Sequence, residues 1–199
     1  IFSSIQQLGY VTHIKLLNAS DYGVPQLRPR VVIIGIRKDQ CGAFAYPEER
    51  SGEAPSVGET LYYLMAQSGW KGAKKWAYGA NKIAPTLVGG SKKHGGPDLG
   101  PTRARTAWAE LGVDGRGIAN EAPSPDFEGM PRLTSRMIAR IQGFPDTWTF
   151  GNKKTIACRM IGNAFPPPVA QAVGIKIKEC LDYGCVDCQS KISISQKAV

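Results

Sequence analysis

Two arginines stand at the entrance of an apolar run in the stretch "PQLRPRVVII", residues 25–34. Arg28 and Arg30 precede Val31-Val32-Ile33-Ile34, a run typical of a strand that is buried on both faces. A cation is expensive to bury without a partner. Either both side chains reach solvent at the strand end, or they hold something anionic or rich in hydrogen-bonding groups. The stretch alone leaves both interpretations open.

A block of positive charge follows in residues 71–105. It holds eight of the 25 lysines and arginines of a chain whose net charge is +9, against Asp98 as its one acidic residue. Trp70, Trp76, Tyr78 and His94 lie among or beside the cations. Such a block is typical of a surface that binds phosphates, and equally of a solvated basic face.

The cysteines and histidines do not form a metal-binding pattern. Cys180, Cys185 and Cys188 are spaced C-x4-C-x2-C, one ligand short of a tetrahedral zinc site, and His13 and His94 lie in no ligand spacing. We therefore expect no metal site, and we expect the cysteines to be free thiols in a reducing compartment. The 42% hydrophobic content predicts a packed core, and no apolar run approaches the ~18 residues of a membrane span.

The first 37 residues have the pattern of an α/β domain. Residues 1–8 show helical spacing that ends at Gly9, and residues 11–17 read as a strand. The turn-rich stretch "NASDYGVPQ" leads to the apolar run, so the two strands are expected to pair as a hairpin. The sequence starts at Ile1 without methionine, which we interpret as a piece of a longer protein.

The composition and periodicity of the sequence change at residue 38 and again at residue 132. Residues 38–131 are rich in Gly and Pro with little sustained periodicity, which predicts a loop-dominated recognition region. A helix is then expected after Thr134 as N-cap, ending at Gly143, with Met137 where Glu would complete a capping box. Prolines 166–168 begin a last helix, and residues 183–199 form a polar tail.

Three stretches occur in a fixed order along the chain: "PQLRPR", "RLTSRMIARIQGFPDTW" and "IGNAFPPPVAQAVG". Together they resemble the C-terminal motifs of the DNA (cytosine-5)-methyltransferases of the bacterial or phage modification type. The resemblance implies part of a Rossmann-like, S-adenosylmethionine-dependent methyltransferase sheet with an inserted small, loop-rich target recognition domain. It divides the chain into catalytic residues 1–37, recognition residues 38–131, a return to the catalytic domain at residues 132–182, and a tail, 183–199.

The resemblance also implies roles for individual residues. The target cytosine is flipped out of the DNA helix, and charge that develops on its ring needs donors held in place. Arg30 is then the cation that binds the cytosine O2 edge, Arg28 contacts DNA phosphate, and Gln26 organises the same loop. The residues that close the S-adenosylmethionine pocket are Gly162, Asn163, Ala164 and Phe165.

Duplex DNA is the implied partner of the recognition region. Lysines and arginines contact phosphates and guanine edges, and glycines allow the backbone to approach. The expected DNA-binding residues are Arg28, Lys82, Ser91, Lys92, Lys93, His94, Arg103 and Arg105.

Three parts of the family's machinery are missing from the sequence: the glycine-rich cofactor loop, the Pro-Cys nucleophile and the Glu that protonates or hydrogen-bonds cytosine N3. Cys41 has no preceding proline and Cys158 reads as buried in a helix, so neither is a convincing nucleophile. We therefore expect a chain that is inactive alone and completed by an N-terminal half, in the bacterial cytoplasm and within a restriction-modification system. The alternatives are a DNA-recognition subunit without catalysis and an RNA cytosine-5 methylase.

Overall fold

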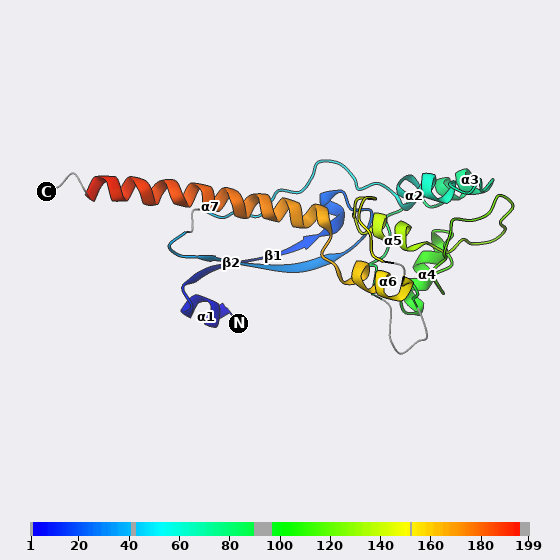
Figure 1. Cartoon of the computed structure of the whole chain (residues 1–199), viewed down its shortest axis with the longest axis horizontal. Helices are drawn as coiled ribbons and strands as arrows, with labels where there is room; N and C mark the ends of the chain where they lie inside the picture. The colour runs from blue at the N-terminus through cyan, green and yellow to red at the C-terminus, as the bar shows by residue number, and fades with distance from the viewer. Residues whose placement is uncertain (1, 41–42, 90–96, 152, 196–199) are drawn as a thin grey trace. The chain divides into compact units, whose positions relative to one another are not determined.

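The computed structural model describes residues 2–40, 43–89, 97–151 and 153–195, with side chains described up to residue 182. The described residues form a mixed α/β structure that divides into two compact units, each made of discontinuous segments (Figure 1). We call them the sheet unit (Ile1–Leu17, Pro29–Glu49 and Val169–Val199) and the helical unit (Asn18–Arg28 and Arg50–Pro168).

The sheet unit contains the hairpin that the sequence predicts. Helix α1 (Phe2–Gln7) ends before Gly9, whose φ of 85° is a left-handed conformation that glycine adopts easily. Strand β1 (Tyr10–Asn18) then pairs with β2 (Pro29–Arg37) in a two-stranded sheet. Helix α7 (Pro167–Ser195) begins at the expected prolines and runs through most of the predicted polar tail.

The expectation that the second strand is buried on both faces is wrong for the described residues. Val31 and Ile33 on β2 are 62% and 41% exposed, and Ile14 and Leu16 on β1 are 55% and 61% exposed. The sheet has two strands in the part of the chain that the structure describes, so these apolar side chains lack the cover that their sequence pattern predicts.

The helical unit is more regular than the sequence suggests. Three short helices occur within the predicted loop-dominated region: α2 (Val57–Met65), α3 (Ala73–Gly79) and α4 (Thr102–Glu110). Ser56 caps α2 through a capping box, accepting from the Glu59 N–H at 3.2 Å while its own N–H donates to the Glu59 carboxylate at 2.7 Å. Sequence periodicity missed these helices because seven to nine residues give too few turns to show a pattern.

Two further helices complete this unit, together with a 3-10 turn at Ala19–Tyr22. Helix α5 (Ser135–Ile141) has the predicted Thr134 cap, and the Met137 sulfur accepts weakly from the Thr134 N–H at 3.4 Å in place of a carboxylate. Helix α6 (Lys154–Asn163) packs against α5. The core they share includes the fully buried Trp108 and Leu61. No helix among the described residues is long and apolar enough to span a membrane.

Helices α2 and α3 meet at a glycine. A Cβ atom on Gly58 would lie 1.9 Å from the Ala77 carbonyl oxygen, so the backbones touch there with no room for a side chain. We predict that Gly58→Ala lowers the free energy of unfolding by about 1–3 kcal/mol, because the helices must separate. Chemical denaturation followed by tryptophan fluorescence measures the change.

Gly79→Ala is the matched control for this prediction. Gly79 ends α3, and no atom lies within 4 Å of the place where its Cβ would be. We expect that substitution to leave the free energy of unfolding unchanged or to raise it by under ~1 kcal/mol. Equal effects of the two substitutions would contradict the tight contact at Gly58.

Candidate functional site

Residues 25–28, the first part of the stretch "PQLRPRVVII", belong to the helical unit and pair there with another segment. The Leu27 N–H donates to the Ala84 carbonyl oxygen at 2.8 Å, and the Ala84 N–H donates to the Pro25 carbonyl oxygen at 2.8 Å. A proline restricts the residue before it to extended conformations, and this pairing requires an extended backbone. The pairing brings the segment around Gln26 next to the segment that leads to Leu87.

Arg28 is buried, with 2% of its surface exposed. Its Nη1 donates to the Leu87 carbonyl oxygen at 2.6 Å. Its Nη2 donates to the Gly162 carbonyl oxygen at 2.6 Å and to the Ala164 carbonyl oxygen at 3.2 Å. One guanidinium therefore joins three segments that are far apart in the sequence.

Two glutamines extend these contacts into a buried polar group. The Gln26 Oε1 accepts from the Leu87 N–H at 2.7 Å, and its Nε2 donates to the Gln142 Oε1 at 2.6 Å. The Gln142 Nε2 in turn donates to the Ala164 carbonyl oxygen at 2.7 Å. We call Gln26, Arg28 and Gln142, with the backbone of Leu87, Gly162 and Ala164, the Arg28 cluster.

The position of the guanidinium explains how a charge is tolerated there. Gly162 lies in the last turn of α6 and Ala164 is its C-cap, so their carbonyl groups present the negative end of the helix dipole. Hydrogen bonds from a cation to such carbonyls are charge-assisted and stronger than neutral ones. This geometry favours a supporting role of Arg28 inside the protein over the phosphate contact expected from the sequence.

Two glycines let the segment after Leu87 pass directly over the end of α6. A Cβ atom on Gly162 would lie 2.6 Å from the Gly89 nitrogen and from the Val88 carbonyl carbon, and one on Gly89 would lie 2.7 Å from the Asn163 Oδ1. The Val88–Gly89 backbone of the protein itself therefore approaches Gly162 closely. Asn163 is exposed, and Phe165 is 38% exposed.

Arg30 has a different environment. It lies on β2 in the sheet unit, its side chain is exposed, and its Nη1 donates to the Pro29 carbonyl oxygen at 2.7 Å. Most of its donors therefore face solvent. Of the two cysteines considered in the sequence, Cys158 is buried in α6, and burial raises the pKa of its thiol, which keeps it protonated. Cys41 lies outside the described residues.

The residues expected to bind DNA are only partly described. Lys82 is exposed, Arg103 is exposed on α4, and Arg105 on the same helix is half-buried beside Thr102. The expected contacts at Ser91, Lys92, Lys93 and His94 lie outside the described residues.

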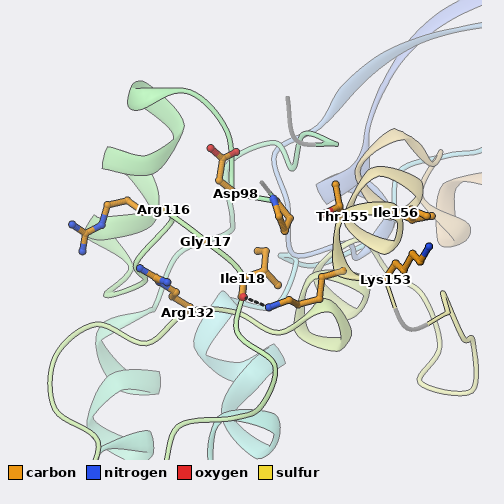
Figure 2. A pocket seen from close by; sticks show the side chains of 10 residues that line it. Asp98, Arg116, Gly117, Ile118, Arg132, Lys153, Thr155 and Ile156 are labelled. Carbon is orange, nitrogen blue, oxygen red and sulfur yellow. Dashed lines mark hydrogen bonds between the residues drawn. The ribbon is translucent and has the colours of Figure 1, made fainter. Parts of the chain in front are cut away.

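A second polar cluster, which no sequence pattern indicated, surrounds Asp114. This carboxylate is buried and accepts from the Arg116 Nε at 2.8 Å and the Arg132 Nε at 3.0 Å. The hydrogen bonds from Arg116, with a smaller contribution from Arg132, hold the pKa of Asp114 well below its usual range, so it stays ionised. Both arginines line a cavity of about 530 Å³ with Lys153 and Lys154 (Figure 2). The pairing of residues 18 positions apart gave no signal in the sequence.

Comparison with known proteins identifies relatives along almost the whole chain. The C-5 cytosine-specific DNA methylase family matches residues 1–179. The chain is 55% identical over 185 residues to the type II methyltransferase M.NaeI of Lentzea aerocolonigenes, which covers 92% of the chain and 45% of that protein. It is 46% identical over 184 residues to the type II methyltransferase M.NgoMIV of Neisseria gonorrhoeae, covering 91% of the chain and 58% of that protein.

A solved structure has a fold similar to that of this chain. A putative DNA modification methyltransferase encoded within a prophage of E. coli matches with a TM-score of 0.52 at 18% identity, over 88% of this chain and 62% of that one. The chain thus spans about half the length of its relatives among the type II methyltransferases. The match over residues 1–179 shows that the chain belongs to the C-5 cytosine-specific DNA methylase family, as part of a type II modification methyltransferase.

Proposed function

We propose that the chain is the C-terminal part of an enzyme that transfers a methyl group from S-adenosylmethionine to C5 of a flipped-out cytosine in duplex DNA. The observation that carries the proposal is the Arg28 cluster. It joins the arginine stretch, the "PTLVG" segment (residues 85–89), the end of α5 and the "IGNAF" segment through hydrogen bonds of 2.6–2.7 Å. The motifs that resemble the methyltransferases thus support one another physically.

The cofactor is assigned to Gly162, Asn163, Ala164 and Phe165. The side chains of Asn163 and Phe165 are exposed, while the Gly162 and Ala164 carbonyl groups are already held by Arg28. An amide that can donate and accept, next to an aromatic face, fits the polar edge and flat ring of an adenosyl group. Bound S-adenosylmethionine supplies the methyl group, and Arg28 and Gln142 hold the segment that contacts it.

Arg30 is our candidate for the residue that binds the flipped cytosine. Its exposed, permanently charged guanidinium offers donors to the base O2 as charge develops on the ring. Arg28 and Gln26 are positioning residues in this proposal, since they act through the segments that they hold. Lys82, Arg103 and Arg105, with the undescribed stretch Ser91–His94, remain our candidates for contacts to duplex DNA.

The partner that completes the site is the N-terminal half of the methyltransferase, in the same chain or as a separate subunit in the bacterial cytoplasm. The exposed apolar side chains of β1 and β2 support this, because further strands of a Rossmann-like sheet would bring the helices that cover both of its faces. The relatives are about twice as long as this chain, which leaves room for such strands. That half would supply the nucleophilic cysteine and the cofactor loop.

Transfer of labelled methyl from S-adenosylmethionine to DNA tests the proposal. We expect transfer when the chain is mixed with the N-terminal half encoded upstream, and none from the chain alone, because no described thiol is both exposed and activated. Activity of the chain alone would contradict this division, and Cys41 would be the first residue to replace. Duplex DNA binding without transfer in the mixture would favour a recognition subunit. Transfer to RNA in preference to duplex DNA would favour an RNA methylase.

Arg30→Ala in the reconstituted enzyme tests the catalytic assignment. We expect the rate of methyl transfer to fall on the order of 100-fold, as for other donors to developing charge. The DNA dissociation constant should change by less than about tenfold, since one contact among many is lost. Arg37→Ala is the control, because Arg37 is an exposed cation at the end of the same strand, paired with Asp39. Equal losses of rate and affinity would show that Arg30 only anchors phosphate.

Arg28→Met tests the positioning role of Arg28. We expect the free energy of unfolding to fall by about 3 kcal/mol, because several buried carbonyl groups lose a charged donor. Arg28→Lys should recover only part of the loss, since an ammonium group lacks the planar fork that reaches both Leu87 and Gly162. Denaturant titration monitored by tryptophan fluorescence measures both. Arg103→Met, on the exposed side of α4, is the control, and an equal effect there would overturn the role.

A further inference from the structure

The cavity beside Asp114 is built by segments that are distant in sequence and belong to one compact unit. Pro97 and Asp98, residues 116–118, Arg132 and residues 153–156 line it, and all lie in the helical unit (Figure 2). Its volume of about 530 Å³ is in the range of ligand-binding pockets. None of its cations is among the residues that the sequence assigned to DNA binding.

The lining carries an excess of positive charge. Four cations, Arg116, Arg132, Lys153 and Lys154, line it together with Asp98, the one acid among the described lining residues. Asp114 neutralises one further charge behind the cavity, so a net positive charge remains. The site is therefore suited to an anion.

Several of these cations are held in place. Asp114 accepts from the Arg116 Nε at 2.8 Å and Nη2 at 3.2 Å, and from the Arg132 Nε at 3.0 Å, which orients both guanidinium groups. The Lys154 Nζ donates to the Ile118 carbonyl oxygen at 3.1 Å, shown by the dashed line in Figure 2. The Lys153 carbonyl oxygen accepts from the Ile156 and Ala157 N–H groups, both at 3.0 Å, while its Nζ has no hydrogen bond or ion pair within the described part of the chain and is available to a ligand. Oriented donors lose less entropy on binding than free side chains.

The first turn of α6 adds to the same cavity. The helix begins at Lys154, and its N-cap, Lys153, provides no side-chain cap for the first N–H groups. The Thr155 hydroxyl also lines the cavity. Helix N-termini attract anions through these N–H groups and the helix dipole, which reinforces the charge of the four side chains.

We propose that this cavity seats one backbone phosphate of the duplex DNA on which the complete methyltransferase acts, an inference that rests on the function proposed above. The exposure of the cations favours a phosphate of a polymer over an enclosed small molecule. The side chains of Arg116 and Arg132 are 70% and 49% exposed, so the rest of the ligand can continue beyond the cavity.

The test is the salt dependence of duplex DNA binding by the full 199-residue chain, measured by fluorescence anisotropy. Each phosphate contact contributes about 0.9 to the slope of log K against log salt concentration. We expect Lys153→Gln with Lys154→Gln to reduce the slope by about 1. The matched control is Lys74→Gln with Lys75→Gln, which removes the same charge from exposed positions on α3 away from the cavity, and should leave the slope unchanged.

The double variant removes the hydrogen bond of Lys154, which could disturb folding. The single variant Lys153→Gln keeps that hydrogen bond, so it tests the inference without this effect. An unchanged slope for the double and single variants, with DNA binding retained, would overturn this inference and leave the proposed function standing. Equal slope changes in the control pair would also overturn it. Absence of duplex DNA binding both by the unaltered chain and by its mixture with the N-terminal half would overturn both.

A second measurement separates DNA from a free anion. Inorganic phosphate is titrated into the chain and the chemical shifts of Lys153 and Thr155 are followed by NMR. Weak millimolar binding that duplex DNA displaces is the expected result. Tight phosphate binding that duplex DNA does not displace would overturn the inference in favour of a small-molecule site.

Discussion

The buried charge of Arg28 is the constraint around which the helical unit is arranged. A guanidinium with 2% of its surface exposed must find acceptors within the protein, and it finds them at Leu87, Gly162 and Ala164. Those acceptors come from segments separated by more than seventy residues at their extremes. The end of α6 and the segment before Gly89 must therefore both be in place before Arg28 is satisfied, which ties these two distant segments to each other.

Short sequence patterns correctly predicted those structural elements that are determined by residues adjacent in sequence. The hairpin, the Thr134 cap and the ends of α1 and α5 at Gly9 and Gly143 are confirmed, because each rests on a backbone preference of a few adjacent residues. The three short helices between residues 57 and 110 were missed, since their stability comes from packing around Trp108 and Leu61 rather than from periodicity.

The candidate site was predictable in composition and not in arrangement. The sequence singled out Gln26, Arg28 and Gly162, and the structure brings them together. The sequence did not indicate that Arg28 points inward. A cation beside a strand has the same sequence pattern whether its acceptors are DNA phosphates or carbonyl groups at a helix end. Asp114 and its two arginines escaped notice for a similar reason: three ordinary surface-type residues become a cluster only when the loops that carry them meet.

The contact between Gly162 and the Val88–Gly89 backbone has a mechanical consequence. Where side chains meet, rotamer changes can absorb a small shift, but here backbone faces backbone with no side chain between them. A shift of the Val88–Gly89 backbone toward Gly162 therefore cannot be absorbed by a side chain at that point. The end of α6 and the Val88–Gly89 segment are therefore coupled through their backbones at Gly162.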